Sequence, residues 1–218
     1  MVATGESSLA RVHVGTSGWS YPSWKPGFYP RGTDAKEFLR FYSERFSTVE
    51  LNTTGYRIPA PEQFRRWAEQ TPDGFRFAPK LAGNRPRVLQ EFAERVGGLG
   101  DRLGPVRVQL KSQRDEGMIE LILGSLDPGV RLAFDLEDPS WNGIEPRLAG
   151  AGAVRVNDLD NDAPFRYVRF RDPPYSDDDL KQWAERLRDG DEPVFAYFRH
   201  EDEPTAPAYA ERFRALLG

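Results

Sequence analysis

Glu50 and Asp135 are the two side chains of this 218-residue chain that are best suited to acid–base chemistry. Each stands in a short segment in which polar and apolar residues alternate, TVELNT (48–53) and RLAFDLE (131–137). Because successive side chains of a strand point to opposite faces, both carboxylates are expected on the polar face of their strand. Two carboxylates that face one cleft can act as general acid and general base, for example in a hydrolase. The alternative is that Glu50 only neutralises a neighbouring arginine.

Cationic side chains outnumber the acidic ones on these polar faces. Seven segments with strand-like alternation carry eight cations and three carboxylates, although the whole chain has a net charge of -4. A surplus of buried positive charge requires a counter-ion, and arginine suits phosphate and carboxylate groups. The pattern therefore predicts an anionic ligand, either a small molecule or a nucleotide. The structural alternative is that the arginines pair with Glu50, Asp135 and Glu137. The eight cations are Arg76, Lys80, Arg107, Lys111, Arg155, Arg169, Arg171 and Arg199.

The residues expected to contact this ligand lie where the strands end, because ligands of α/β barrels bind at the C-terminal ends of the strands. Lys80 fits a phosphate clamp better than a Schiff base, since the charges around it favour its protonated form. Trp19 and Tyr21, after the first strand, could stack on a sugar or a nucleobase. The candidate binding residues are Trp19, Tyr21, Asn52, Lys80, Gln109, Asn157, Arg169, Arg171, Tyr197 and Arg199.

Composition narrows the chemistry. The chain has no cysteine and two histidines, which excludes thiol catalysis and makes a catalytic metal improbable, so we predict neither a metal nor a cofactor. A net charge of -4 argues against a general nucleic-acid coating protein, although a local nucleic-acid site stays open. The sequence shows no signal peptide and no apolar run of membrane-spanning length. We therefore expect a cytoplasmic protein without membrane contact.

Strand-like segments alternate with helical ones along the whole chain. Helices are expected at about 33–46, around Phe64 and Trp67, and at 86–96, 115–126, 177–188 and 205–217. Eight strands with mostly helical connections predict the α/β class and a TIM-like (β/α)8 barrel, with reduced fifth and sixth units. An open doubly wound sheet is the alternative, but its central strands would be continuously apolar. We expect one domain over residues 1–218, with residues 1–10 as a flexible tail.

Two specific motifs, GTSGWSYPSWKPGFYP (15–30) and TVELNTTGY (48–56), resemble the YecE-like family, the domain of unknown function 72. Weaker matches, such as DPSW (138–141) and YVRF (167–170), extend the resemblance over nearly the whole chain. The resemblance implies a TIM barrel and leaves the activity open. The later half departs from the family pattern, with Arg and Asp at 171 and 172 and Arg and His at 199 and 200 in place of histidine–glycine and two asparagines. These departures indicate a short, divergent member that binds a different ligand or has lost the family's activity.

Three functions stay open at this point. The first is a metal-independent hydrolase or lyase acting on a phosphorylated or otherwise anionic small molecule. The second is a non-catalytic binder of nucleic acid or nucleotide that uses the same cationic and aromatic residues. The third is a sugar-active enzyme that uses the paired carboxylates. A barrel fold does not choose among them, because it hosts many chemistries.

Overall fold

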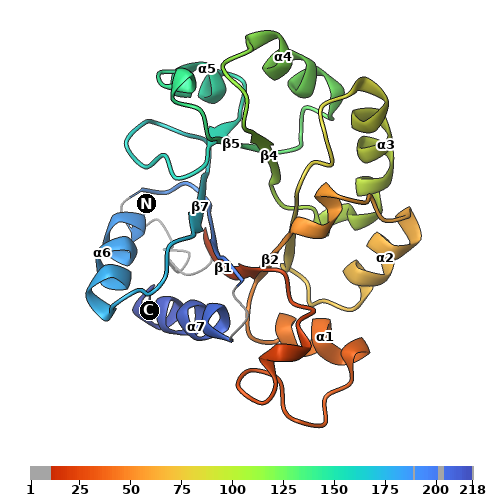
Figure 1. Ribbon diagram of the computed structural model, residues 1–218, viewed down its shortest axis with the longest axis vertical. Coiled ribbons are helices and arrows are strands. Elements are labelled where there is room, and N and C mark those ends of the chain that lie inside the picture. Colours follow the sequence, from red (N-terminus) through yellow and green to blue (C-terminus); the bar gives the residue numbers. More distant parts are fainter. Residues whose placement is uncertain (1–10, 189, 201–203, 218) are drawn as a thin grey trace, which may run out of the picture.

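The computed structural model describes residues 11–188, 190–200 and 204–217. In this part of the chain, eight parallel strands form a ring with the helices on its outside (Figure 1). The predicted α/β class and TIM-like barrel are confirmed, while the tail predicted at 1–10 lies outside the described residues. The strands are β1 (Val12–Ser17), β2 (Thr48–Leu51), β3 (Arg76–Pro79), β4 (Val106–Leu110), β5 (Leu132–Leu136), β6 (Val154–Arg155), β7 (Arg166–Phe170) and β8 (Val194–Phe198).

The helices follow the order that the apolar periodicity predicts. The first predicted helix, 33–46, is interrupted: a 3-10 turn (Ala35–Glu37) begins at Asp34, whose N–H donates to the Glu37 carboxylate, and only then does α1 start. The short α5 and the lack of a helix in the described segment between β6 and β7 agree with the predicted reduction of the fifth and sixth units. The α-helices are α1 (Phe38–Ser43), α2 (Pro61–Glu69), α3 (Pro86–Val96), α4 (Glu116–Ser125), α5 (Glu145–Gly150), α6 (Asp177–Arg188) and α7 (Thr205–Leu217).

The ring consists of two hydrogen-bonded arcs, β3-β2-β1-β8-β7 and β4-β5-β6. Two backbone hydrogen bonds join β3 to β4: the N–H of Gly104 donates to the carbonyl of Phe77 (2.7 Å), and the N–H of Leu81 donates to that of Arg107 (2.9 Å). The seam at β3 and β4 is therefore closed, and the C-terminal ends of all eight strands surround one opening.

Asn157 joins β6 to β7 at the other seam. Its N–H donates to the carbonyl of Tyr167 (2.9 Å). Its side-chain amide makes two further bonds to the backbone of Arg169, donating to the carbonyl (3.0 Å) and accepting from the N–H (2.7 Å). Asn157 has a φ of 64°, in the left-handed region that asparagine tolerates better than most residues. The side chain thus replaces ladder bonds that a two-residue β6 does not supply.

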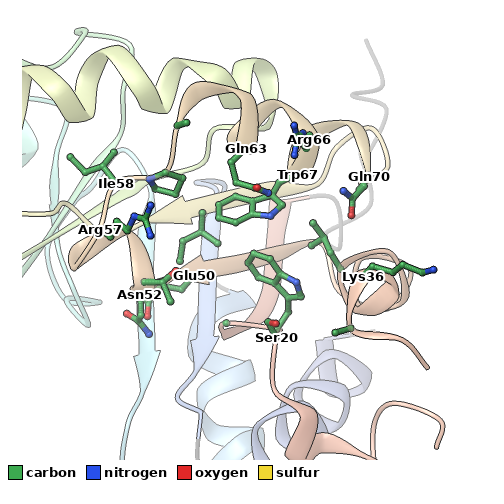
Figure 2. Close-up of a pocket in the computed structure, with 18 of the residues that line it drawn as sticks. Ser20, Lys36, Glu50, Asn52, Arg57, Ile58, Gln63, Arg66, Trp67 and Gln70 are labelled. Carbon is green, nitrogen blue, oxygen red and sulfur yellow. The ribbon is translucent and has the colours of Figure 1, made fainter. Parts of the chain in front are cut away.

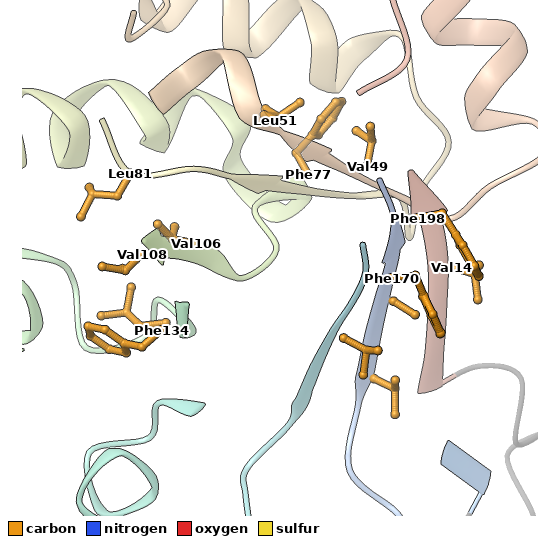
Figure 3. Packing of buried hydrophobic residues seen from close by; sticks show 14 of the residues in the cluster. Val14, Val49, Leu51, Phe77, Leu81, Val106, Val108, Phe134, Phe170 and Phe198 are labelled. Carbon is orange, nitrogen blue, oxygen red and sulfur yellow. The ribbon is translucent and has the colours of Figure 1, made fainter. Parts of the chain in front are cut away.

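The barrel has two apolar regions. The larger one lies between the strands and the surrounding helices, and Figure 3 shows part of it around Val49, Phe77 and Phe134. The smaller one fills the lower interior of the barrel with side chains from β3, β5, β6, β7 and β8 and their ends. Its members are Ala78, Ala133, Val154, Val156, Phe165, Tyr167, Phe195 and Tyr197. The buried ionic groups described below lie above this apolar cluster, toward the C-terminal ends of the strands.

The polar face predicted for β6 was wrong. Val154 and Val156 point into the barrel, whereas Arg155 points outward and donates to Glu145 of α5 (2.5 Å). The usual rule that a barrel strand is apolar on its outer side depends on a helix that covers it. No helix follows β6 in the described segment, so its outer face carries the polar residues and its inner face the valines.

Candidate functional site

Five side chains at the C-terminal end of the barrel form a buried ion network, the mouth network: Glu50, Asp135, Arg107, Arg169 and Arg171. Arg169 forms a bidentate ion pair with Glu50: its Nε and Nη2 each lie 2.9 Å from a carboxylate oxygen. Arg107 lies between the acids, with Nε 3.1 Å from Glu50 Oε1 and Nη1 2.7 Å from Asp135 Oδ2. Arg171 Nη2 donates to Asp135 Oδ1 (2.6 Å). The structural alternative therefore holds for these three arginines, since each of them pairs with Glu50 or Asp135.

Two neutral groups complete the mouth network. The Tyr167 hydroxyl donates to Glu50 Oε1 (2.8 Å), and Arg107 Nη2 donates to the side-chain oxygen of Asn52 (2.8 Å). Tyr167, Arg169 and Arg171 share one face of β7 and its extension because they are two residues apart. Tyr167 and Arg107 were absent from the predicted binding set, although this spacing and the polar face of β4 were signals that could have found them.

Burial and the arginines act in opposite directions on the two acids. Burial raises the pKa of Glu50, but the charges of Arg169 and Arg107 outweigh it and hold the pKa below its usual value. Burial likewise raises the pKa of Asp135, and the hydrogen bond from Arg171 with the arginine charges brings it below its usual value. Both side chains are therefore carboxylates at neutral pH, and their oxygens are already occupied by donors.

Lys80 adds a positive charge to this group without an acidic partner. It follows β3 directly and is partly exposed, and its backbone forms an isolated parallel β-bridge with that of Arg107 in the neighbouring strand. Its ammonium lies 5.5 Å from the centre of the Tyr56 ring, and it makes no ion pair within the described ranges. Burial lowers its pKa and the charge of Arg107 lowers it further, while Glu50 opposes both. The amine is thus a cation in a site that already holds excess positive charge.

The remaining predicted rim residues divide into two groups. Arg199 follows β8 next to Arg171, because Phe170 and Phe198 are paired in the ladder, and it is exposed and without an ion pair in the described part of the chain. Gln109 is occupied elsewhere: it donates to Glu137, which also lies 3.5 Å from Lys111. Arg199 therefore extends the cationic rim, and Gln109 belongs to a separate polar group.

Two predicted binding residues lie in other roles. Tyr197 is completely buried in the lower interior, where its hydroxyl shares a hydrogen bond with Thr48 (2.8 Å). Tyr197 lies two residues before Arg199 on the same face of β8, so Arg199 and not Tyr197 reaches the C-terminal opening of the barrel. Asn157 is exposed, but both ends of its amide are bound to the backbone of Arg169. Tyr197 therefore lies deeper in the barrel than the strand pattern predicted, and the Asn157 amide is used by the backbone.

Trp19 and Tyr21 lie in the loop after β1, as predicted. Tyr21 stacks on His200 with ring centroids 3.5 Å apart, and its hydroxyl donates to the carbonyl of Ser17 (2.9 Å). Trp19 contacts Trp67 of α2 edge to face, with centroids 5.2 Å apart. Both side chains are partly exposed and line a groove that opens beside the mouth network. Trp19 is the better placed of the two for contact with a ligand, because Tyr21 is already covered on one face.

The described residues contain no group of three or more histidine, aspartate or glutamate side chains that could hold a metal ion. None of the helices in the described ranges has the length and apolar character needed to cross a bilayer.

The model of the family described as protein of unknown function DUF72 matches residues 13–218. The chain belongs to the DUF72 family. Among curated proteins, YecE of Escherichia coli K12 is 34% identical over 109 residues, which cover 45% of this chain and 37% of YecE. YunF of Bacillus subtilis 168 is 30% identical over 69 residues, which cover 32% of this chain and 23% of YunF. The aligned part thus spans well under half of either relative.

Solved DUF72 structures share the fold. A DUF72 family protein (EF0366) from Enterococcus faecalis V583, in a crystal structure at 3.10 Å resolution, superimposes with a TM-score of 0.78 at 16% identity. The superposition covers 94% of this chain and 95% of that one. A second crystal structure of EF0366, at 2.52 Å, gives a TM-score of 0.76 at 15% identity. At this identity the likeness establishes the barrel fold alone.

Proposed function

We propose that this DUF72 protein binds an anionic, phosphate-bearing ligand at the C-terminal mouth of its barrel. The observation that carries the proposal is the charge of the mouth. Three arginines of the mouth network and Lys80 stand against Glu50 and Asp135, four positive charges against two negative ones, a formal excess of +2. Partly buried charge without a counter-ion is unfavourable, so a bound anion would stabilise the site.

The donors for this anion are the side chains that the two acids do not use up. Arg171 reaches Asp135 through Nη2 alone among the described residues, and its side chain is 29% exposed, while its Nε is buried without a hydrogen-bond partner in the same part of the chain. Lys80 and Arg199 make no ion pair among the described residues and reach the surface. Arginine can present two parallel N–H groups to a phosphate, and lysine adds a point charge. Arg107 and Arg169 lie deeper and serve mainly to hold the carboxylates.

Glu50 and Asp135 were predicted as an acid–base pair, and their surroundings favour a different role. Glu50 has no exposed surface, accepts hydrogen bonds from Tyr167 and Arg169, and forms an ion pair with Arg107 at 3.1 Å. A general acid needs a proton at working pH, and a base needs a free oxygen within reach of the substrate. We therefore assign the two carboxylates to positioning the arginines and propose binding without a proton-transfer step.

Calorimetric titration of the whole protein with inorganic phosphate and with glucose 6-phosphate tests the proposal, with glucose as the neutral control. Both phosphates should bind, and glucose should not. Lys80→Met should weaken binding about 10- to 100-fold, the usual effect of losing a hydrogen bond to a charged group. Lys111→Met is the matched control, because Lys111 is 72% exposed and pairs with Glu137. Affinity should also fall as pH rises through the pKa of Lys80, which lies below its usual 10.5.

The proposal is wrong if neither phosphate binds, or if Lys80→Met and Lys111→Met weaken binding equally. Binding of glucose at the same affinity as glucose 6-phosphate would point instead to a sugar site.

A further inference from the structure

A groove of about 950 Å³ opens beside the mouth network, between the loop after β1 and helix α2 (Figure 2). Its inner end lies at Asn52, in front of the fully buried Glu50. From there it passes along α2 toward Gln70. The volume lies at the upper end of the range for small-molecule sites, so the groove admits more than a single phosphate group.

One face of α2 forms a wall of this groove. Gln63, Arg66, Trp67 and Gln70 all line it and are spaced i, i+3, i+4 and i+7, which places them on the same side of a helix. Phe64 packs into the core from the adjoining side. A helix face directed at its own protein is normally aliphatic. This face instead carries two amides, a guanidinium and an indole, which are groups that recognise polar, planar partners.

The charges along the groove are positive. Its cationic lining residues are Lys36, Arg57, Arg66 and Arg95, and its acidic lining residue, Glu50, is neutralised by Arg169 and Arg107. Arg57 and Arg66 make no ion pair in the described part of the chain. The neighbouring Arg65 is different, because it pairs with Glu62 at 2.7 Å and does not line the groove. Arg65 is therefore a paired charge on the surface, whereas the adjacent Arg66 is an unpaired charge in the groove.

The cations stand toward different ends of the groove, with an aromatic side chain between them. In Figure 2, Arg57 lies near Ile58 on one side, Lys36 lies on the opposite side, and Trp67 lies between them. Trp67 and Trp19 are both partly exposed and meet edge to face. Lys36 also pairs with Asp34 (3.5 Å) and Arg95 with Glu91 (2.7 Å), so the unpaired charges among the described residues of the groove are Arg57 and Arg66. A ligand with repeated negative charges and flat rings between them would contact both of these arginines and the indoles.

From this arrangement we infer that the groove binds a short single strand of nucleic acid. Grooves for single strands combine cations that follow the phosphates with aromatic side chains on which bases stack. Glutamine amides can donate to and accept from the exposed edges of unpaired bases. An acidic peptide would match the charges but would give the indoles and amides no planar partner. The inference uses residues outside the mouth network and goes beyond the phosphate site proposed there.

Fluorescence anisotropy of the whole protein with a labelled eight-residue oligothymidylate tests the inference over a series of salt concentrations. Arg66→Gln should weaken binding at low salt at least about fivefold and make the plot of log K against log salt less steep by about 0.7, the value for one phosphate contact on a single strand. Arg65→Gln, the matched control, should change neither quantity. Trp67→Leu should weaken binding about tenfold or more through lost stacking.

Further variants distinguish a loss of oligothymidylate binding from a loss of folding. Trp67 also contacts Phe64 and Phe77, so circular dichroism must show that Trp67→Leu is folded, and Arg57→Gln supplies a second groove variant at an exposed position. Lys80→Met should weaken phosphate binding at the mouth about 10- to 100-fold while leaving oligothymidylate binding within about threefold of the parent, the spread that context alone introduces. The two proposals therefore fail separately.

Three outcomes would overturn the inference. The first is no binding of the oligothymidylate at low salt. The second is equal weakening by Arg65→Gln and Arg66→Gln, which would mean that surface charge alone attracts the strand. The third is equally tight binding of an octaglutamate peptide, which would show a site for polyanions without recognition of bases.

Discussion

Replacing Glu50 by glutamine removes one charge from the mouth network and keeps the shape of the side chain. Glu50 is completely buried and is contacted by Tyr167, Arg169 and Arg107, so the variant leaves two guanidinium groups next to a neutral amide. The formal excess at the mouth, Lys80 included, rises from +2 to +3. Breaking a buried ion pair by removing one partner costs about 3–5 kcal/mol. In a chain of this size, that corresponds to a fall of about 6–20 °C in Tm.

The assay is guanidinium unfolding of the parent, Glu50→Gln and a control, Glu137→Gln. Glu137 pairs with the exposed Lys111, and a surface pair contributes only about 0–1 kcal/mol. Phosphate should also stabilise Glu50→Gln more than the parent, because the variant has more positive charge to neutralise. The pKa of Glu50 is held below its usual 4.5, so its contribution is present above pH 4.5 and is lost as pH falls through the folded-state pKa. The difference between parent and variant should therefore shrink in acid.

A loss in Glu50→Gln no larger than that in Glu137→Gln would refute the reasoning. It would show that the buried contacts of Glu50 stabilise the fold little more than hydration of the same groups would. The excess of positive charge at the mouth would then no longer support the proposed anion site.

Other predictions concern the frame that holds the site. Gly15→Ala should prevent stable folding, because a Cβ there would lie 1.9 Å from the Thr48 carbonyl oxygen, whereas Gly124→Ala in open space on α4 should stabilise the protein by about 0.5–1 kcal/mol in thermal unfolding. Burial, with two nearby arginines, lowers the pKa of His13 to about 4. The free energy of unfolding of the parent should therefore fall by at most about 3 kcal/mol as pH drops from 6.5 to 4. His13→Phe should remove this pH dependence, as measured by denaturant titrations at several pH values. Asn157→Gly should lose the two side-chain hydrogen bonds across the seam between β6 and β7. Asn157→Ala should lose the same bonds and be less stable than the glycine variant by about 1–2 kcal/mol, because only glycine accepts the positive φ without strain. Equal stabilities of the two variants in calorimetry would contradict this.

The alternation of polar and apolar residues was sufficient to predict the barrel and most of its helices. Helices at 86–96, 177–188 and 205–217 have the predicted bounds, because each begins and ends at clear breaks in the apolar period. The first helix was predicted too long, since Asp34 begins a 3-10 turn before α1. The phase of β6 was also wrong, because alternation shows two faces but does not show which of them a helix will cover.

The site was predictable in outline and not in its contacts. Strand periodicity placed Glu50, Asp135 and Arg169 on interior faces, and the structure brings them together. Which arginine pairs with which acid depends on how far each side chain reaches across the barrel, and a strand pattern carries no information about that reach. Tyr197 and Arg199 illustrate the limit in depth: they share a face, but one pleat separates a buried side chain from an exposed one.

The pairing within the mouth network also determines where a ligand can bind. Arg107 and Arg169 are held by Glu50, Asp135 and Asn52, so an anion that displaced those contacts would have to overcome buried, charge-assisted hydrogen bonds. The side chains with unused donors, Lys80, Arg171 and Arg199, stand nearer the surface. The family resemblance predicts a histidine at position 171 and an asparagine at position 199, where this chain has arginine. Each arginine adds a positive charge at the rim, so the proposed anion site would depend in part on these two residues.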